Sequence, residues 1–307
     1  MAAIRFGVDI GGSKIEVAAL LGETETVAVR RRAPTPRGPE DYQAILDTVA
    51  ALVSEVAAEL GRPAPDRIGV GIPGSLSPET GLVRNANTLA MNGRAFDRDL
   101  SARLGRLVRL ENDANCFALA EALAGAGRGA DPVFGVIVGT GVGGGVVVGG
   151  RVVSGATRIA GEWGHTPLPR PREEERPGHL CFCGRRGCVE TWCCGPALAR
   201  EHGLRGGSEA DGEAIAAAAA RGDTRARETL EIHGERLGRA LGPVVNILDP
   251  EVIVLGGGLS NIAGLAERVL AGLRPHVFSD CLRTRVVRAA LGAGAGVIGA
   301  AWLWPEA

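Results

Sequence analysis

The sequence predicts an α/β protein built from two domains, and three observations lead to this prediction. Short apolar strands alternate with amphipathic helices along the chain. A strand, a glycine turn carrying a hydroxyl residue, and a second strand occur at residues 4–21 and again at 133–153. The length of 307 residues corresponds to about two domains. The repeated hairpin therefore indicates two similar halves.

Apolar runs in the first half predict short strands, at residues 4–10, 15–21, 68–72 and 107–110. Segment 41–60 predicts an amphipathic helix, because its apolar residues recur at the spacing i, i+3, i+4 and i+7 and Gly61 ends it. A second helix is expected to begin after the strand at 107–110 and to run to about Ala126.

The second half predicts strands and helices in alternation, with strands at 133–138, 146–153 and 252–255 and helices near 212–220, 224–247 and 296–304. We expect one domain over residues 1–115 and the other over 116–295. The C-terminal helix, within 296–307, is expected to pack on the first domain. The least regular stretch, 166–190, is rich in Pro, Arg, Glu and Cys.

The composition is that of a soluble globular protein, with 45% hydrophobic and 22% charged residues. The formal net charge of −1 gives no electrostatic reason to expect binding to nucleic acid or to an anionic membrane. No apolar run approaches the roughly 18–20 residues that span a bilayer, and Asp9 precedes any signal-peptide core. We therefore expect a cytoplasmic protein without nucleic-acid or membrane partners.

The first glycine turn is a candidate phosphate-binding site. Gly11 and Gly12 let backbone N–H groups approach an anion closely, while Ser13 and Lys14 add a hydroxyl and a positive charge. Asp9, at the entrance of the turn, could hold a hydrated Mg²⁺ ion. Lys14 is the only lysine in the chain, which indicates that a compact charge is needed there. The alternative is an ordinary hairpin turn, and the spacing of a P-loop is absent.

Two further glycine turns lie in the second half. The first contains Gly139, Thr140, Gly141, Gly143 and Gly144, and a valine-rich strand follows it. A dinucleotide-binding motif needs a helix at that point, so a second phosphate turn fits better. The triple glycine at 256–258 follows a buried strand and precedes a helix. Together the three turns indicate a bound nucleotide.

The segment Glu111-Asn112-Asp113-Ala114-Asn115 joins a predicted strand to a predicted helix. Asp and Asn are favoured helix caps, which offers a purely structural explanation. The functional explanation is that Asp113, at the end of a strand, acts as a general base for a hydroxyl nucleophile. An aspartate plays this part in kinases.

A cysteine cluster in the irregular stretch predicts a metal site. Cys181, Cys183 and Cys188 have a spacing that suits structural zinc with one further ligand, and they belong to an enzyme-sized chain with seven cysteines. Spacing alone leaves the fourth ligand open among nearby candidates: His165, His179, Cys193 and Cys194. Three buried thiols are the structural alternative. A zinc ion would order the 166–190 loop, which has few apolar residues.

Taken together, these motifs resemble the ROK family of sugar kinases and sugar-responsive repressors, over nearly the whole chain. Within that family the sequence looks most like bacterial fructokinases that also accept mannose. The resemblance rests on the turns and the cysteine cluster described above, and on shorter matching segments at residues 71–75, 85–87, 92–93, 161–169 and 301–305. Ser13 stands where the family more often has Thr, and the hydroxyl is kept.

The resemblance implies the two-domain actin-like ATPase fold, also called hexokinase-like or ribonuclease H-like, with an interdomain cleft. It implies that ATP and Mg²⁺ bind at the glycine turns, through Asp9, Gly11, Gly12, Ser13, Lys14, Gly139, Thr140, Gly141, Gly143, Gly144, Gly256 and Gly257. The family's sugar-binding residues match Asn87, Asn112, Asp113, Glu162, His165 and Glu190. Asp113 matches the catalytic base, and His165 matches the zinc histidine, which favours it over His179.

The activity implied by the resemblance is ATP-dependent phosphorylation of fructose, and also of mannose, to the sugar 6-phosphate. The alternative is a kinase of the same family that acts on N-acetylglucosamine or glucose. A non-catalytic sugar-sensing protein is a further alternative, but a repressor needs a helix-turn-helix module ahead of Asp9, where eight residues stand. Assembly as a homodimer stays open.

Overall fold

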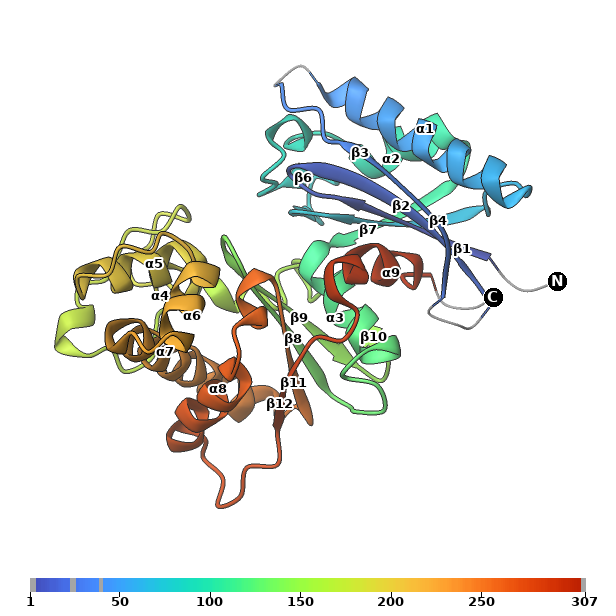
Figure 1. The fold of residues 1–307 in the computed structure, drawn as a ribbon. Coiled ribbons are helices and arrows are strands. Elements are labelled where there is room, and N and C mark those ends of the chain that lie inside the picture. Colours follow the sequence, from blue (N-terminus) through green and yellow to red (C-terminus); the bar gives the residue numbers. More distant parts are fainter. Residues whose placement is uncertain (1–3, 23–25, 39–40, 305–307) are drawn as a thin grey trace. The chain divides into compact units, whose positions relative to one another are not determined.

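The computed structural model describes residues 4–22, 26–38 and 41–304. It divides into two compact units, of which the first comprises Met1–Ala124, Val152–Ala160 and Ala293–Ala307, and the second Gly125–Arg151 and Gly161–Gly292. Each unit has a five-stranded sheet and its own helices (Figure 1). The predicted α/β class is therefore confirmed.

The sheet of the first unit has the strand order β3-β2-β1-β4-β7. These strands are β1 (Ile4–Ile10), β2 (Lys14–Leu21), β3 (Val27–Pro34), β4 (Arg67–Ile72) and β7 (Leu107–Asn112). β2 runs antiparallel to β1 and β3, whereas β1, β4 and β7 are parallel to one another. A separate small sheet pairs β5 (Ser75–Leu76) with β6 (Val83–Arg84).

Helices cover both faces of this sheet (Figure 1). One face carries α1 (Tyr42–Leu60) and α2 (Phe96–Leu104), and the other carries α3 (Asp113–Ala124) and α9 (Ala295–Ala301). Glycines let the backbone of α9 lie directly against the strands. A Cβ at Gly7 of β1 would lie 2.0 Å from the carbonyl oxygen of Val297, and one at Gly69 of β4 would lie 1.8 Å from that of Ala300.

The first unit extends beyond the boundary that we expected near residue 115, because it includes α3. This helix packs against α9 so closely that a Cβ at Gly299 would lie 1.7 Å from the carbonyl oxygen of Cys116. α9 ends at Ala301, earlier than the predicted 304. Residues 305–307 of the expected C-terminal helix lie outside the described residues.

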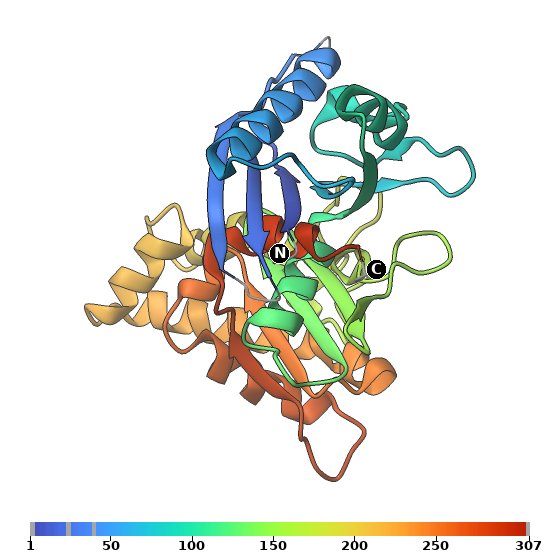
Figure 2. The same cartoon turned by 90° about the vertical axis from the view of Figure 1, so that its right-hand side faces the viewer.

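The sheet of the second unit has the order β10-β9-β8-β11-β12. Its strands are β8 (Val133–Val138), β9 (Val142–Val148), β10 (Arg151–Val152), β11 (Val252–Gly256) and β12 (Arg285–Arg288). Figure 2 shows β8 and β9, in green, beside β11 and β12, in orange to red, although the two pairs are far apart in sequence.

Strand β9 begins at Val142, four residues before the predicted start at 146, so Gly143, Gly144 and Gly145 belong to the strand. Pairing with β8 places them there. A Cβ at Gly144 would lie 2.6 Å from the Trp163 indole, so this glycine leaves room for that side chain. The glycine turn itself is shorter than predicted.

Helices of the second unit pack on this sheet and on one another, and they are α4 (Glu190–Cys193), α5 (Gly195–Leu204), α6 (Gly212–Ala220), α7 (Thr224–Leu248) and α8 (Leu265–Leu273). Asp211 and Asp223 cap α6 and α7 by accepting hydrogen bonds from the backbone N–H groups of Ala214 and Ala226. Within the described residues, no helix is both long and apolar enough to cross a membrane.

Helix α7 buries a histidine whose ring lacks hydrogen-bond partners among the described residues. Both ring nitrogens of His233 are buried and unpaired. Burial, helped by the positive charge of Arg236, lowers the pKa of His233 from 6.5 to about 4. The unfolded chain therefore binds a proton at this position at a higher pH than the folded chain does. The stability that depends on neutral His233 is present above pH 6.5 and is lost as the pH falls towards 4.

Replacing His233 by leucine is expected to weaken the pH dependence of stability, because leucine cannot take up a proton. Between about pH 7 and pH 5, the wild type should lose about 2 kcal/mol more free energy of unfolding than His233→Leu loses. Urea unfolding of both proteins at the two pH values measures this difference. Equal losses in the two proteins would contradict the assignment.

Candidate functional site

Three carboxylates gather at one edge of the first sheet. Asp9 lies near the carboxyl end of β1, Glu111 near that of β7, and Asp113 begins α3 directly after β7. Because β1 and β7 run in the same direction, their carboxyl ends meet at the same edge, where ligands of α/β sheets bind. Burial first, and then the charges of these three carboxylates, raise the pKa of the Cys116 thiol.

Hydrogen bonds fix the turn that carries Asp113. The N–H of Ala114 donates to Oδ1 of Asn112 at 2.9 Å and to Oδ1 of Asp113 at 2.8 Å. Glu111 accepts at Oε1 from Nδ2 of Asn115 at 3.0 Å, and at Oε2 from the hydroxyl of Ser154 at 2.6 Å. Glu111 and Ser154 thus hold the turn in place. The sequence pattern did not predict this part for either residue, although Glu111 begins the 111–115 motif.

The structure brings Asn87 and Asn112 to the same short loop. The backbone N–H of Asn87 donates to the carbonyl oxygen of Pro73 at 3.2 Å. Nδ2 of Asn112 donates to the carbonyl oxygen of the next residue, Gly74, at 3.3 Å. Two predicted sugar-binding residues that are 25 positions apart in sequence therefore flank one loop.

Asp9 lies in a confined, acidic environment. A Cβ at Gly71 would lie 3.5 Å from its Oδ1, and one at Gly296 would lie 2.8 Å from its Oδ2. Burial and the neighbouring carboxylate of Glu16 raise the pKa of Asp9 to about 6, against a smaller lowering by Lys14. A cation bound here would stabilise the ionised carboxylate, as a Mg²⁺ site requires.

The first glycine turn presents an open backbone. Gly12 and Ser13 are exposed, and a Cβ at Gly12 would meet no atom within 4 Å. Lys14 forms an ion pair with the buried Glu16, at 2.9 Å, and Arg30 approaches the same carboxylate at 3.4 Å. Packing within the described residues therefore does not require glycine at position 12. A glycine there leaves the backbone open to close approach by a ligand.

The two glycine turns of the second unit are neighbours. β8 and β11 pair in parallel, so the turn after β8 and the loop after β11 leave the sheet side by side. A Cβ at Gly139 would lie 3.9 Å from the backbone nitrogen of Gly258, and one at Gly257 would lie 2.3 Å from the carbonyl oxygen of Val138. Gly256 ends β11, and Thr140 is exposed. The predicted nucleotide residues of this unit therefore lie together, except that Gly143 and Gly144 are part of strand β9.

Glu190 connects the second turn to the cysteine cluster. Its Oε2 accepts a hydrogen bond from the N–H of Val142 at 3.0 Å, and its Oε1 lies 3.9 Å from Sγ of Cys181. Sγ of Cys181 lies in turn 3.5 Å from Nδ1 of His165. Glu162 is exposed at the start of the short 3₁₀ turn that carries His165. The predicted sugar-binding residues of this unit therefore lie beside the cluster.

His165, Cys181, Cys183 and Cys188 form a group that could hold a metal ion, because one ligand atom of each lies within 4.8 Å of the others. The Sγ atoms of Cys183 and Cys188 are 3.6 Å apart. A tetrahedral zinc ion, with Zn–S bonds of about 2.3 Å, keeps sulfur ligands about 3.8 Å apart. Residue types and spacing therefore suit zinc.

The other three candidates for the fourth ligand, His179, Cys193 and Cys194, make different contacts. The ring of His179 packs on Trp192, with centroids 4.6 Å apart. Cys193 and Cys194 are buried in the core of the second unit, and burial raises the pKa of Cys193 to about 12. Among the described residues, the group that could bind a metal contains His165 and none of these three.

Comparison with known proteins gives concordant matches. A model of the ROK family matches residues 5–307. An N-acetyl-D-glucosamine kinase from Aliivibrio salmonicida (strain LFI1238) is 36% identical over 302 residues, which are 97% of this chain and 98% of that protein. The crystal structure of a ROK hexokinase from Thermus thermophilus is 32% identical with a TM-score of 0.85, covering 98% of this chain and 97% of that one. A ROK family glucokinase from Streptomyces griseus, in complex with glucose and AMPPNP, is 29% identical with a TM-score of 0.79, covering 98% and 99%.

Proposed function

Because the chain belongs to the ROK family, we propose that it is a sugar kinase that transfers a phosphoryl group from ATP to N-acetylglucosamine. The Aliivibrio relative, named for this activity, aligns with 97% of the chain. None of the three proteins reported above is named a fructokinase. These comparisons therefore favour the alternative substrate over fructose and mannose.

The observation that carries the proposal is the placement of Asp113 and Asp9 at one edge of one sheet. Sugar kinases need a base for the attacking hydroxyl and a metal ion at the phosphates. Asp113 is held at the start of α3, and the confined Asp9 lies near the end of β1. Asp113 therefore suits the part of the base, and Asp9 suits the metal site.

In this mechanism Asp113 accepts the proton of a sugar hydroxyl while the hydroxyl oxygen attacks the γ-phosphate in line. The residues that match the family's sugar-binding set would orient the remaining hydroxyls, namely Asn87, Asn112, Glu162, His165 and Glu190. Nδ1 of His165 faces Cys181, so its Nε2 is the nitrogen left to bond a hydroxyl.

The glycine turns supply the contacts to ATP. Backbone N–H groups at the exposed Gly12 and Ser13 and at the turn after β8 would donate to phosphate oxygens, whereas the N–H of Gly11 donates to the carbonyl oxygen of Lys14 at 2.9 Å and shapes the turn. The loop at Gly256 and Gly257 would lie along the adenosine. When bound near Asp9, Mg²⁺ would neutralise the charge that develops on the phosphates.

We further propose that zinc occupies the group of His165 and the three cysteines as a structural ion. With four protein ligands it would have no open position for chemistry. Its part would be to order the 166–190 loop and to fix the orientation of the His165 ring.

A coupled ADP-release assay with Mg-ATP tests the proposal on four sugars: N-acetylglucosamine, glucose, mannose and fructose. The expected result is the highest kcat/KM with N-acetylglucosamine, about tenfold or more above the others. Protein groups that hydrogen-bond the acetamido group would be left unpaired when a sugar without that group binds. A preference for fructose would contradict the substrate but keep the kinase. Absence of turnover with all four would contradict the kinase and favour a sugar-sensing protein.

A further inference from the structure

The second unit contains a cavity of about 400 Å³, within the range of small-molecule sites. Its wall is formed by residues of the 172–179 segment, by Arg186, by residues of α4 and α5 with the following Arg205, and by Ile232 and Arg236 of α7. Six arginines and three glutamates line it, so positive charge is in excess by three. None of these residues belongs to the ATP, hexose or zinc sets assigned above.

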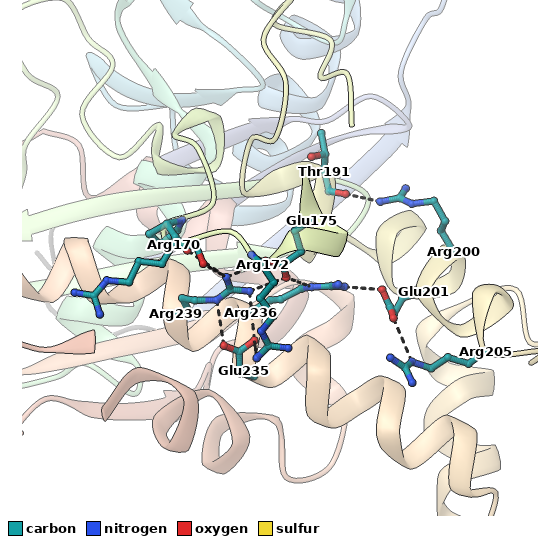
Figure 3. Close-up of polar contacts among 11 residues, drawn as sticks. Arg170, Arg172, Glu175, Thr191, Arg200, Glu201, Arg205, Glu235, Arg236 and Arg239 are labelled. Carbon is teal, nitrogen blue, oxygen red and sulfur yellow. Dashed lines mark hydrogen bonds and ion pairs between the residues drawn. The ribbon is translucent and has the colours of Figure 1, made fainter. Parts of the chain in front are cut away.

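Two of the three glutamates are already neutralised by arginines (Figure 3). Glu175 is fully buried, and its Oε1 accepts from Nε of Arg236 at 2.8 Å and from Nη2 of Arg239 at 2.7 Å. Burial opposes ionisation, but hydrogen bonds from Arg239, from the backbone of Arg172 and from Arg236 lower the pKa of Glu175 to about 2. Glu201 accepts from Arg236 at 2.7 Å and from Arg205 at 3.1 Å. These ion pairs form one fixed part of the cavity wall.

Three arginines of the wall are left without a carboxylate. Arg186 and Arg200 donate to the backbone carbonyl oxygens of Gly178, at 3.3 Å, and Thr191, at 2.5 Å. Neither they nor Arg176 form an ion pair within the described part of the chain. A guanidinium stays charged at all physiological pH values, and its planar fork matches phosphate oxygens.

One side of the cavity is apolar, and it includes Trp192, Ala197, Leu204 and Ile232. The indole of Trp192 is held by His179 and by the guanidinium of Arg236, whose Cζ lies 4.9 Å from the ring centroid. The wall thus combines a cationic part with an apolar part. A ligand that fits both has an anionic group on a small carbon skeleton.

We propose that this cavity binds a small molecule that carries a phosphate dianion, with Arg176, Arg186 and Arg200 contacting the phosphate. The fixed Glu175–Arg236–Glu201 network keeps Glu175 and Glu201 from pairing with these arginines. The apolar wall accommodates the carbon skeleton of a phosphate monoester. Inorganic phosphate has the same anionic group as a phosphate monoester but no carbon skeleton.

Isothermal titration calorimetry of the full chain tests this proposal, with inorganic phosphate and glucose 6-phosphate as probes. The double variant Arg176→Ala/Arg200→Ala is expected to bind both about 100-fold more weakly, because two charge-assisted contacts are lost. Both side chains are exposed, so the variant should fold as the wild type does. The control is Arg221→Ala, an exposed arginine at the end of α6 that lies outside the cavity.

A third variant changes the candidate catalytic base and leaves the lining of the cavity unchanged. Asp113→Asn should bind inorganic phosphate as the wild type does, because Asp113 does not line the cavity. Tighter binding of glucose 6-phosphate than of phosphate would support the monoester as the ligand. Absence of binding at millimolar concentrations, wild-type affinity in the double variant, or loss of binding in Arg221→Ala or Asp113→Asn would overturn the proposal. Since the assay measures binding, it does not depend on the proposed kinase activity.

Discussion

Asp113→Asn is expected to reduce kcat for N-acetylglucosamine by about 10²- to 10⁴-fold, the range for a positioned general base. The amide cannot accept the proton of the attacking hydroxyl. Its oxygen can still accept the hydrogen bond from the N–H of Ala114, which is 2.8 Å long in the wild type. The fold and the KM for the sugar should therefore change little. ADP-release kinetics and thermal unfolding measure these quantities together.

The control for this variant is Asp66→Asn, which removes a carboxylate of the first unit that is 94% exposed and far from the candidate residues in the chain. Its kcat should equal that of the wild type. If Asp113→Asn kept near-normal kcat, Asp113 would be a helix-capping residue only. If it lost its thermal transition instead, the loss of activity would report unfolding and a Glu replacement would be needed to decide between base and cap.

Local sequence patterns predicted those helices and strands in which apolar residues recur at the spacing of a helix or a strand. Helix α1 follows its apolar spacing, begins at Tyr42, one residue later than predicted, and ends at Leu60, directly before Gly61. Strand β3 was not predicted, because Arg30, Arg31 and Arg32 interrupt the alternation of polar and apolar residues. It forms because β2 supplies its hydrogen-bond partners. Pairing between strands thus overrides the local signal.

Long-range contacts explain what the sequence left open in the candidate site. Spacing could not choose between His165 and His179, because nothing periodic in residues 166–180 shows where that loop returns. The ion pair of Lys14 with Glu16 follows from the two-residue period of a strand, which places both side chains on one face of the sheet. The sequence alone does not tell whether Lys14 pairs with a ligand or with a carboxylate of the chain. Glu175 meets Arg236 across 61 positions, so no local motif marks the arginine-lined cavity.

Loss of the proposed zinc ion is the second large effect that we expect. The wild type should carry about one zinc per chain, and Cys183→Ser and His165→Asn should bind zinc at least about 100-fold more weakly, since each loses one of four ligands. Matched controls are Cys281→Ser, an exposed cysteine outside the group, and His179→Asn, the histidine that packs on Trp192. Both should keep their zinc. Metal analysis of the purified proteins measures this directly.

The instability that follows should begin in the loop between His165 and Cys188. Backbone pairing there is sparse, with isolated bridges from Pro167 to Cys188 and from Leu180 to Arg186, and few of its side chains are buried and apolar. We therefore expect faster hydrogen exchange in residues 166–190 than in α7, whose core side is packed independently of the group. Zinc-free wild type, or loss of zinc from His179→Asn in place of His165→Asn, would contradict the site.

The zinc variants should also weaken sugar binding more than ATP binding. Sγ of Cys181 lies 3.9 Å from Glu190, which is itself fixed by the N–H of Val142. His165 is proposed both to bind the ion and to bond a sugar hydroxyl, so releasing the ion frees the ring that faces the sugar. KM for the sugar should rise by about tenfold or more and KM for ATP by less, because His165 belongs to the proposed sugar set, whereas the ATP turn after β8 is linked to the group through Glu190 and the N–H of Val142. Equal rises in both constants would show general unfolding of the unit instead of a local effect on the sugar residues.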